Sequence, residues 1–398
     1  MTGGPAMPPP LAAVALSART LAQAARRAGE PCVALDLFSD ADTAAAAVAM
    51  APLRGDFGRG FDRGDLLGTL RSLRGRVAGV VYGAGFESAP DLLDEIGGVL
   101  PLVGNGAAAV RRVKEPAALA ALFAQAGLPH PEIARGPPPR DGGEWVAKQE
   151  GGSGGEHVVP ADTIRRQPGV AGDPGLYFQR RVPGEALSAL FLADGRRRAL
   201  VIGFTLQWPS PTPAAPYRFG GCAGPVAPAA SLARRIAEAC DALVEMTGLV
   251  GLNSLDLLID GDGGAVHAIE INPRPGATLD VFDALCAPPL WRLHCEAAIR
   301  GSLPDRVALR EGTARAAGIL HAPARLSVDT SLRWPAWVAD RPAAGSGIEA
   351  GMPLCTVQAS AADAGAARRR VEERARLLCS ALPFDDAGHS RQRLRRNA

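Results

Sequence analysis

Lysine and asparagine are scarce in this sequence, although cations are common. Lysine occurs only at Lys114 and Lys148, so 41 of the 43 cations among the 398 residues are arginine. Asparagine occurs only at positions 105, 253, 272 and 397. We interpret the shortage as the codon bias of a GC-rich genome, under which both residues are kept mainly where Arg, Asp or Gln would not serve. The few that remain are therefore informative.

Other shortages exclude whole classes of protein. The 43 Lys plus Arg nearly balance the 41 Asp plus Glu, so the footprint of a nucleic-acid or membrane-surface protein is absent. No apolar run reaches the roughly 18 residues that span a bilayer, and the first ten residues lack the positive charge of a signal peptide. The seven cysteines include no C-x-x-C pair, which disfavours zinc ribbons and disulfide frameworks and favours a reducing cytoplasm.

The first hundred residues alternate between strand-like and helical patterns. Strands are predicted at about 11–16, 32–38, 78–86 and 101–105, with an amphipathic helix ending at Gly29 and an alanine-rich helix after Asp42. This alternation predicts a parallel, doubly wound α/β sheet over roughly residues 10–106. Ser17 and Arg19 follow the first strand, where ligands of such sheets usually bind. A helix cap and a surface cation are equally good interpretations of these two residues.

The remaining chain mixes helices with antiparallel strands. A helix is predicted from Ala107 and a long amphipathic helix over 230–248. Strands are predicted at 145–149, 176–182 and 198–208, and a hairpin at 252–272 with a D-G-G turn. Beyond about residue 310 the sequence is β-rich and closes with a charged helix. The predicted units are residues 1–106, 107–310 (small lobe about 107–183, large lobe about 184–310), 311–384 and a basic tail at 385–398.

The hairpin gathers three oxygen-bearing side chains. Glu270 and Asn272 are two residues apart and so face the same way, and strand pairing can bring Asp256 alongside them. Two carboxylates and an amide oxygen are hard ligands that suit Mg²⁺ better than zinc. An ordinary solvated hairpin with an Asn-Pro turn is the alternative.

Both lysines are candidate phosphate contacts. Lys148 precedes the glycine-rich loop Gly151-Gly152-Ser153-Gly154-Gly155, whose backbone N–H groups can approach phosphate oxygens closely. A hairpin tip without function is the alternative for this loop. Lys114, near the start of the helical segment that begins at Ala107, would ordinarily be a surface cation, but surface cations in this chain are otherwise arginine.

The order of these features resembles the ATP-grasp superfamily over roughly residues 10–300. The resemblance rests on Lys114, Lys148 with its glycine loop, the segment 179–185, Asp256, and Glu270-Ile-Asn272-Pro-Arg274. It implies a Rossmann-like domain, a two-lobed ATP-grasp and a small β-rich C-terminal region, of mixed α/β and α+β class. It also implies that both lysines contact ATP phosphates and that Asp256, Glu270 and Asn272 hold two Mg²⁺ ions, with Mn²⁺ as a substitute.

The hinge departs from the family pattern. The strand before Pro183-Gly184-Glu185 implies adenine contacts from the backbone of Gln179, Arg180 and Val182. The family commonly carries an acid where this chain has Gln179 or Arg180, so Glu185 is the substitute ribose ligand to test.

The resemblance implies an ATP-dependent carboxylate–amine ligase that forms an amide through an acyl phosphate. Arg274, two residues after Asn272, is placed to hold the substrate carboxylate or to stabilise the acyl phosphate, with a structural ion pair as the alternative. We expect Arg218 in the segment Tyr217–Cys222 to be a second contact with the carboxylate or a phosphate. Small-molecule carboxylates and amines are the expected partners, a homodimer stays open, and nucleic acid and membrane are not expected. A bicarbonate-using carboxylase subunit and a nucleotide-binding regulator without turnover are the alternatives.

The whole-chain pattern narrows the resemblance further. The run S-A-R-T-L-A-Q-A-A-R-R-A-G, the acidic stretch after it and Y-G-A-G-F-E look most similar to uncharacterised ATP-grasp proteins of one-carbon cofactor pathways in methylotrophs and methanogens. This implies amino-acid ligation, such as glutamate onto tyramine or a methanofuran- or pterin-type precursor. The segment G-M-P-L-C-T-V resembles the β-rich part of biotin-carboxylase-like and purine-pathway members, yet it has no lysine that could carry biotin.

Overall fold

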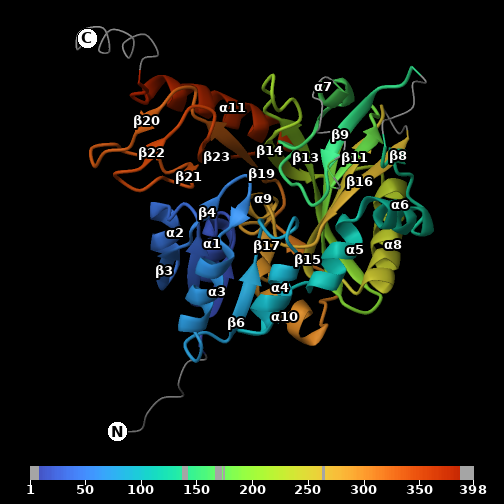
Figure 1. The fold of residues 1–398 in the computed structure, drawn as a ribbon, viewed down its shortest axis with the longest axis horizontal. Helices are drawn as coiled ribbons and strands as arrows, with labels where there is room; N and C mark the ends of the chain where they lie inside the picture. Colours follow the sequence, from blue (N-terminus) through green and yellow to red (C-terminus); the bar gives the residue numbers. More distant parts are fainter. Residues whose placement is uncertain (1–8, 137–141, 166–172, 174, 262–264, 386–398) are drawn as a thin grey trace.

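The computed structural model describes residues 9–136, 142–165, 173, 175–261 and 265–385. The predicted D-G-G turn at 262–264 and almost all of the predicted basic tail lie outside these residues. Among the described residues, no helix is long and apolar enough to cross a membrane. Figure 1 shows the N-terminal sheet, the two lobes that follow it and the C-terminal strands arranged around the centre of the molecule.

The N-terminal part is a five-stranded parallel sheet of order β3-β2-β1-β6-β7. Its side chains alternate between faces: Ala13 and Val81 face α1 and α10, whereas Val14 and Val80 face α3 and α4. This confirms the predicted α/β sheet. The strands are β1 (Leu11–Val14), β2 (Cys32–Asp36), β3 (Ala49–Pro52), β6 (Gly79–Tyr82) and β7 (Leu102–Val103), and the helices are α1 (Arg19–Arg27), α2 (Ala41–Ala46), α3 (Arg63–Ser72) and α4 (Asp91–Gly97), with a small hairpin of β4 (Gly55–Asp56) and β5 (Gly60–Phe61).

A small lobe follows, built on a four-stranded antiparallel sheet of order β10-β9-β11-β8. Two helices lead into it, and the break between them is local: Glu115 precedes Pro116, which disfavours helical backbone at Glu115, and the Glu115 carboxylate caps the second helix. The elements are α5 (Ala107–Lys114), α6 (Pro116–Gln125), β8 (Ile133–Ala134), β9 (Trp145–Gln149), β10 (Val159–Pro160), α7 (Ala161–Arg165) and β11 (Leu176–Arg180).

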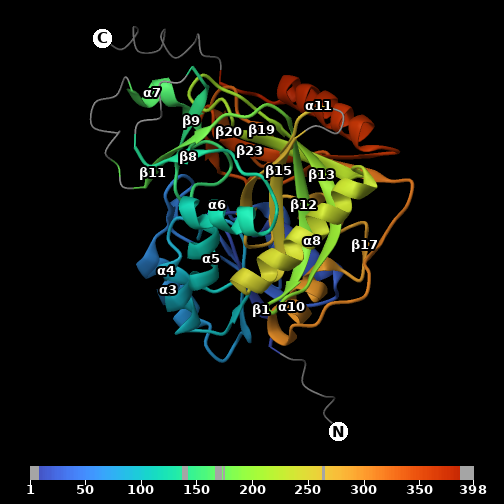
Figure 2. The same ribbon diagram turned by 90° about the vertical axis from the view of Figure 1, so that its right-hand side faces the viewer.

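The large lobe is an eight-stranded sheet of order β16-β15-β12-β13-β14-β19-β23-β21. One face packs on α6 and α8, as Figure 2 shows for α8, and the other on α9 and α10. Its strands are β12 (Glu185–Asp194), β13 (Ala199–Pro209), β14 (Phe219–Val226), β15 (Val250–Ile259), β16 (Val266–Asn272), β19 (Ala314–His321), β21 (Val338–Ala339) and β23 (Pro353–Ala361), and its helices are α8 (Ala230–Thr247), α9 (Leu279–Phe282), α10 (Leu290–Arg300) and α11 (Ala364–Ala381).

The C-terminal strands extend this same sheet. β19 pairs antiparallel with β14, and β23 pairs with β19, so the β-rich segment continues the large lobe, and α11 covers it. Two small ribbons complete the fold: β17 (Cys286–Ala287) with β18 (Ala308–Leu309), and β20 (Leu326–Ser327) with β22 (Gly347–Ile348).

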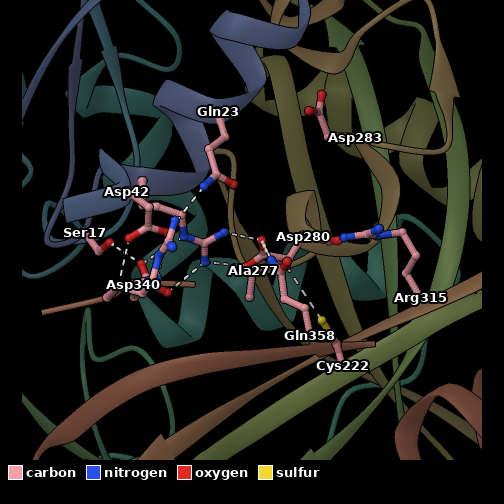
Figure 3. Close-up of polar contacts among 12 residues, drawn as sticks. Ser17, Gln23, Asp42, Cys222, Ala277, Asp280, Asp283, Arg315, Asp340 and Gln358 are labelled. Carbon is pink, nitrogen blue, oxygen red and sulfur yellow. Dashed lines mark hydrogen bonds and ion pairs between the residues drawn. The ribbon is translucent and has the colours of Figure 1, made fainter. Parts of the chain in front are cut away.

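Arg19 joins three parts of the molecule. Its guanidinium is 2% exposed and bonds both oxygens of Asp280 from α9, with Nη2 to Oδ2 at 2.8 Å. It also bonds Asp340, with Nε to Oδ1 at 3.0 Å and Nη2 to Oδ2 at 2.8 Å. Figure 3 shows Asp280 and Asp340 facing one another across this contact, with Ser17 beside Asp340. Arg19 therefore forms a buried ionic clamp, that is, a set of ion pairs that joins the N-terminal part to α9 and to the segment at Asp340. Neither a ligand contact nor a surface cation, the two interpretations from the sequence, anticipated this role.

Candidate functional site

The β15–β16 hairpin brings the three predicted metal ligands together. Asp256 lies directly opposite Glu270, and Ser254 lies opposite Asn272. The next pair along is Leu257 with Ala268, so Ile269 is an extra residue in β16 and forms a bulge. The bulge turns Glu270 and Asn272 to the face that carries Asp256, while Ala268 packs in the core beneath α8.

Hydrogen bonds fix the three side chains relative to one another. The Asn272 Nδ2 donates to Asp256 Oδ2 at 2.9 Å and to Glu270 Oε1 at 3.3 Å. Ser188 Oγ, on the neighbouring strand β12, donates to Asp256 Oδ1 at 2.5 Å. Ser188 is a supporting residue that the sequence reasoning missed.

Lys114 contacts the Glu270 and Asn272 side chains of this group. Its Nζ is 3.3 Å from Glu270 Oε2 and 3.3 Å from Asn272 Oδ1, and the side chain is 7% exposed. The ammonium group of Lys114 therefore lies beside the predicted metal ligands. Lys114 is buried, although a lysine in a helix would ordinarily be expected at the surface. The end of α5 before Pro116 delivers it there.

The electrostatics of the group favour a further cation. Burial and the nearby Glu270 charge raise the pKa of Asp256. Burial would also raise the pKa of Glu270, but Lys114 and Lys148 hold it below its usual value. Two buried carboxylates side by side repel one another, and a divalent ion relieves this repulsion.

The donor set fits Mg²⁺. Two carboxylates and one amide offer the oxygen ligands that Mg²⁺ prefers. In this structure the Asn272 Nδ2 donates to both carboxylates and its Oδ1 accepts from Lys114, so ligation through the amide oxygen would require Asn272 and Lys114 to rearrange together. Among the described residues no group of three or more His, Cys, Asp or Glu side chains could hold a metal.

Lys148 faces the hairpin from the small lobe. It lies opposite Tyr177 in the β9–β11 pair, and its Nζ, 5.9 Å from the Tyr177 ring centre, donates to Gln179 Oε1 at 3.3 Å. Burial lowers the pKa of Lys148, and the charges of Glu270 and Asp256 oppose that shift. A buried ammonium with one hydrogen-bond acceptor among the described residues is suited to an anionic ligand.

The glycine loop needs its glycines. Gly151 has φ of +71°, and a Cβ there would come within 2.5 Å of the Glu87 carbonyl oxygen. Gly155 has φ of +74°, and a Cβ would come within 2.1 Å of the Tyr217 carbonyl oxygen. The Phe219 N–H donates to the Gly154 carbonyl at 2.8 Å. The loop is therefore pressed between the N-terminal part and the strand β14.

The space beneath this loop is small. A cavity of about 20 Å³ is lined by Lys114, Lys148, Tyr177, Glu270 and other residues, among them Gly151 and Gly152. The ring of His157 occupies the position that a Cβ of Gly152 would take, and Ser153 lies between these glycines. A nucleotide needs far more room than 20 Å³, so the residues that line this cavity would have to move apart for one to bind here.

The other hinge residues, Arg180, Val182 and Glu185, do not lie on the sheet face that carries Lys148. Arg180 stacks on Trp145 at 4.8 Å and pairs with Glu132 at 2.9 Å, on the opposite face of the small sheet from Lys148. Val182 lies in the connection between β11 and β12, and Glu185 is exposed at the start of β12. The side chain of Arg180 is thus directed away from the face of the small sheet that carries Lys148.

Arg274 is paired with an acid that the sequence reasoning did not single out. Its Nε donates to Glu87 Oε1 at 2.5 Å, and the two side chains are 10% and 4% exposed. Glu87 Oε2 also accepts from the N–H groups of Gly85 and Phe86, each at 3.0 Å. Burial would raise the pKa of Glu87, but Arg274, Lys114 and these amides keep it below its usual value.

Arg218 is directed elsewhere. Its Nε donates to the Ser210 carbonyl at 3.0 Å, and Nη1 donates to the Gly351 carbonyl at 3.3 Å. These bonds join β14 to the C-terminal segment, so the geometry does not support the expected substrate contact, and we leave Arg218 out of the site.

The two unassigned asparagines support the turn after Asn272. Asn105 Nδ2 donates to Asn253 Oδ1 at 2.8 Å and to the Pro273 carbonyl at 2.9 Å. Tyr82 Oη donates to the same Pro273 carbonyl at 3.2 Å. Asn105 and Asn253 are 2% and 0% exposed. Three of the four asparagines therefore converge on one turn.

Comparison with known proteins agrees with this geometry. Residues 117–278 match the model of the ATP-grasp domain. None of the curated protein sequences matches the chain significantly.

Solved structures with the same fold cover almost the whole chain. N5-carboxyaminoimidazole synthetase from Staphylococcus aureus, complexed with ADP, has a TM-score of 0.66 at 13% identity and covers 93% of this chain and 98% of its own. The biotin carboxylase domain of 2-oxoglutarate carboxylase from Hydrogenobacter thermophilus, with MgADP and bicarbonate, has a TM-score of 0.70 at 10% identity, with coverage of 91% and 88%. Biotin carboxylase from Campylobacter jejuni has a TM-score of 0.65 at 11% identity, with coverage of 90% and 89%. At these identities the likeness establishes the fold alone.

Proposed function

We propose that the protein is an ATP-dependent, ADP-forming ligase that joins a carboxylate to an amine. The observation that carries the proposal is the meeting of Asp256, Glu270 and Asn272 with Lys114 on one buried face, opposite Lys148. Hard oxygen ligands and two ammonium groups are what phosphoryl transfer requires, since catalysis there depends on positioning and charge neutralisation.

The chemistry is a two-step transfer. The substrate carboxylate attacks the γ-phosphorus of ATP, so that ADP leaves and an acyl phosphate forms. The amine nitrogen then attacks the acyl carbon, phosphate leaves, and the ammonium proton is released. Mg²⁺, held by Asp256, Glu270 and Asn272, would neutralise the triphosphate charge.

The protein groups position these reactants. Lys114 and Lys148 would hold the phosphates, and the glycine loop 151–155 would cover them and exclude water. Arg274 would hold the carboxylate, while Glu87 fixes the orientation of its guanidinium. The backbone at Gln179, Arg180 and Val182, with Glu185, is our proposal for the adenosine end.

We propose an amino acid, with glutamate as the first choice, as the carboxylate, and an amine of one-carbon cofactor synthesis as its partner. Sequence resemblance alone supports this narrower choice.

A bicarbonate-using carboxylase is the second candidate. The fold favours this candidate, because the carboxylases and the synthetase above have the same fold over nine-tenths or more of this chain. In that case bicarbonate takes the place of the carboxylate and no added amine is needed for ADP release. A nucleotide-binding regulator without turnover is disfavoured because the complete set of two carboxylates and an amide serves no purpose in it.

Coupled ADP release across a panel of amino acids with amines tests the proposal, with glutamate plus tyramine included. The expected result is release that requires both the acid and the amine. Release with bicarbonate alone would replace the ligase by the carboxylase. If neither bicarbonate nor any acid–amine pair produces ADP release, the regulator is favoured. Glu270→Gln is the blank for every pair, and Glu238→Gln, an exposed change on α8, is its matched control.

A further inference from the structure

A hydrogen-bond chain leads from the bulge in β16 to Lys148. His130 Nδ1 lies 2.7 Å from the Ala268 carbonyl oxygen, and its Nε2 lies 3.2 Å from Gln179 Nε2. Gln179 Oε1 lies 3.3 Å from Lys148 Nζ. The chain thus starts on the metal-binding strand of the large lobe and ends at the buried ammonium of the small lobe.

Only one arrangement of protons satisfies every member of this chain. A carbonyl oxygen can only accept, so the proton of His130 must be on Nδ1. The other ring nitrogen then has a free lone pair and must accept from the Gln179 amide N–H. This turns the amide oxygen of Gln179 toward Lys148, which can only donate. Each link fixes the orientation of the next.

The surroundings hold the first link in place. The Ala268 N–H donates to the Pro129 carbonyl at 2.8 Å. Both backbone groups of Ala268, its N–H and its carbonyl, are therefore hydrogen-bonded to the segment before β8. The His130 ring also packs on Phe123, with ring centres 5.3 Å apart. Burial lowers the pKa of His130 to about 4, which keeps the ring neutral.

We propose that His130 and Gln179 are positioning residues that fix the ammonium of Lys148 for an anionic ligand. Neither side chain needs to touch the ligand. Because Ala268 is two residues from Glu270, the chain sets the distance between the metal-binding strand and the phosphate lysine, and so couples the two lobes. The inference rests on the proposed function in one respect, that the anion is a nucleotide phosphate.

Matched substitutions separate this role from packing. His130→Phe keeps the ring and its contact with Phe123 but removes both hydrogen bonds, whereas His130→Gln keeps one donor and one acceptor. Gln179→Leu removes the last link. Glu132→Gln, on the same segment but pairing with Arg180 on the outer face, is the control.

The scarcity of lysine makes the first readout direct. With isotope-labelled lysine only two side chains give signals, and Lys148→Arg assigns them. In the unliganded wild-type protein we expect inequivalent ε-protons for a fixed Lys148, and a His130 ring protonated on Nδ1 alone. The two ε-protons should become equivalent in His130→Phe and Gln179→Leu, and stay distinct in His130→Gln and Glu132→Gln. An Nε2-protonated His130, or an unchanged Lys148 signal in both disrupting variants, overturns the proposal.

The second readout is the affinity for MgADP by calorimetry. Loss of one hydrogen bond that positions Lys148 should weaken binding about five- to tenfold in His130→Phe and Gln179→Leu, with recovery in His130→Gln. Lys148→Arg is the positive control. If Lys148→Arg weakens binding and the two disrupting variants do not, the chain has no positioning role. If wild-type protein binds no nucleotide, the proposed function fails, and the lysine signals still decide whether the chain fixes Lys148.

Discussion

Arg274 and Glu87 form a buried ion pair between the hairpin strand and the N-terminal sheet, with Nε 2.5 Å from Oε1. Glu87 follows β6 and Arg274 follows β16, so the contact crosses from one part of the chain to the other. Glu87 uses its second oxygen on two backbone amides, which fixes the carboxylate and through it the guanidinium. Nη1 of Arg274 donates to the Pro275 carbonyl at 3.4 Å, so among the described residues Nη2 is the group left to meet a substrate.

Replacing Arg274 by Lys should harm the carboxylate step and spare the nucleotide. A point charge cannot reproduce a planar fork, so kcat/KM for the carboxylate should fall by a factor on the order of 100, a loss typical of one removed charge-stabilising donor. MgADP affinity by calorimetry should be unchanged. Arg135→Lys, at an exposed pair with Glu115 and Glu150, is the matched control. A variant with normal turnover and saturation would remove Arg274 from the substrate site.

Glu270→Gln should abolish ADP release at ordinary Mg²⁺ concentrations. The amide keeps the shape and can still accept from Lys114, but it removes one of the two anionic ligands. Because the chemistry needs the metal charge, more Mg²⁺ or Mn²⁺ should restore little. Circular dichroism should show an intact fold. Turnover that persists with an intact fold would contradict the metal assignment.

The site could be predicted where local spacing decides the geometry. Side chains two apart on a strand face the same way, which is why Glu270 and Asn272 were correctly paired with Asp256. The bulge at Ile269 could not be foreseen, because it arises from the pairing of β16 and not from its own sequence. Arg218 was misplaced for a similar reason: nothing local indicates that Gly351, 133 residues away, accepts its hydrogen bond.

One interior strand of the large sheet, β12, was missed altogether. β12 reads Glu-Ala-Leu-Ser-Ala-Leu-Phe-Leu-Ala-Asp, which is rich in helix-forming Ala and Leu and has no alternation, since both of its faces are buried. It is a strand because β13 and β15 pair along its length. The alanine-rich helix predicted next to Asp42 is present as α2, and it is short: α2 ends at Ala46, and β3 begins at Ala49 as the sheet edge.

Arg19→Met should destabilise the protein strongly. It leaves Asp280 and Asp340 buried without their cation, and breaking a buried ionic network costs about 3–5 kcal/mol. Arg54→Met, at a pair in which the arginine is 80% exposed, should cost no more than about 1 kcal/mol. Urea unfolding followed by tryptophan fluorescence measures both. Equal midpoints for the two variants would mean that Arg19 does not clamp the three parts.

Asp40 should make the protein less stable as the pH rises. Burial, and then the carboxylates of Asp340, Asp36 and Asp42, raise its pKa from 3.8 to about 8. Between these values the folded state binds a proton that the unfolded state has lost, so folding stability falls from about pH 4 to about pH 8. Asp40→Asn mimics the protonated acid, and should raise Tm relative to wild type near pH 8 and change it little near pH 4. Asp305→Asn, at an exposed position, is the control. A Tm difference for Asp40→Asn that is the same at both pH values would show that Asp40 is ionised in the folded protein throughout.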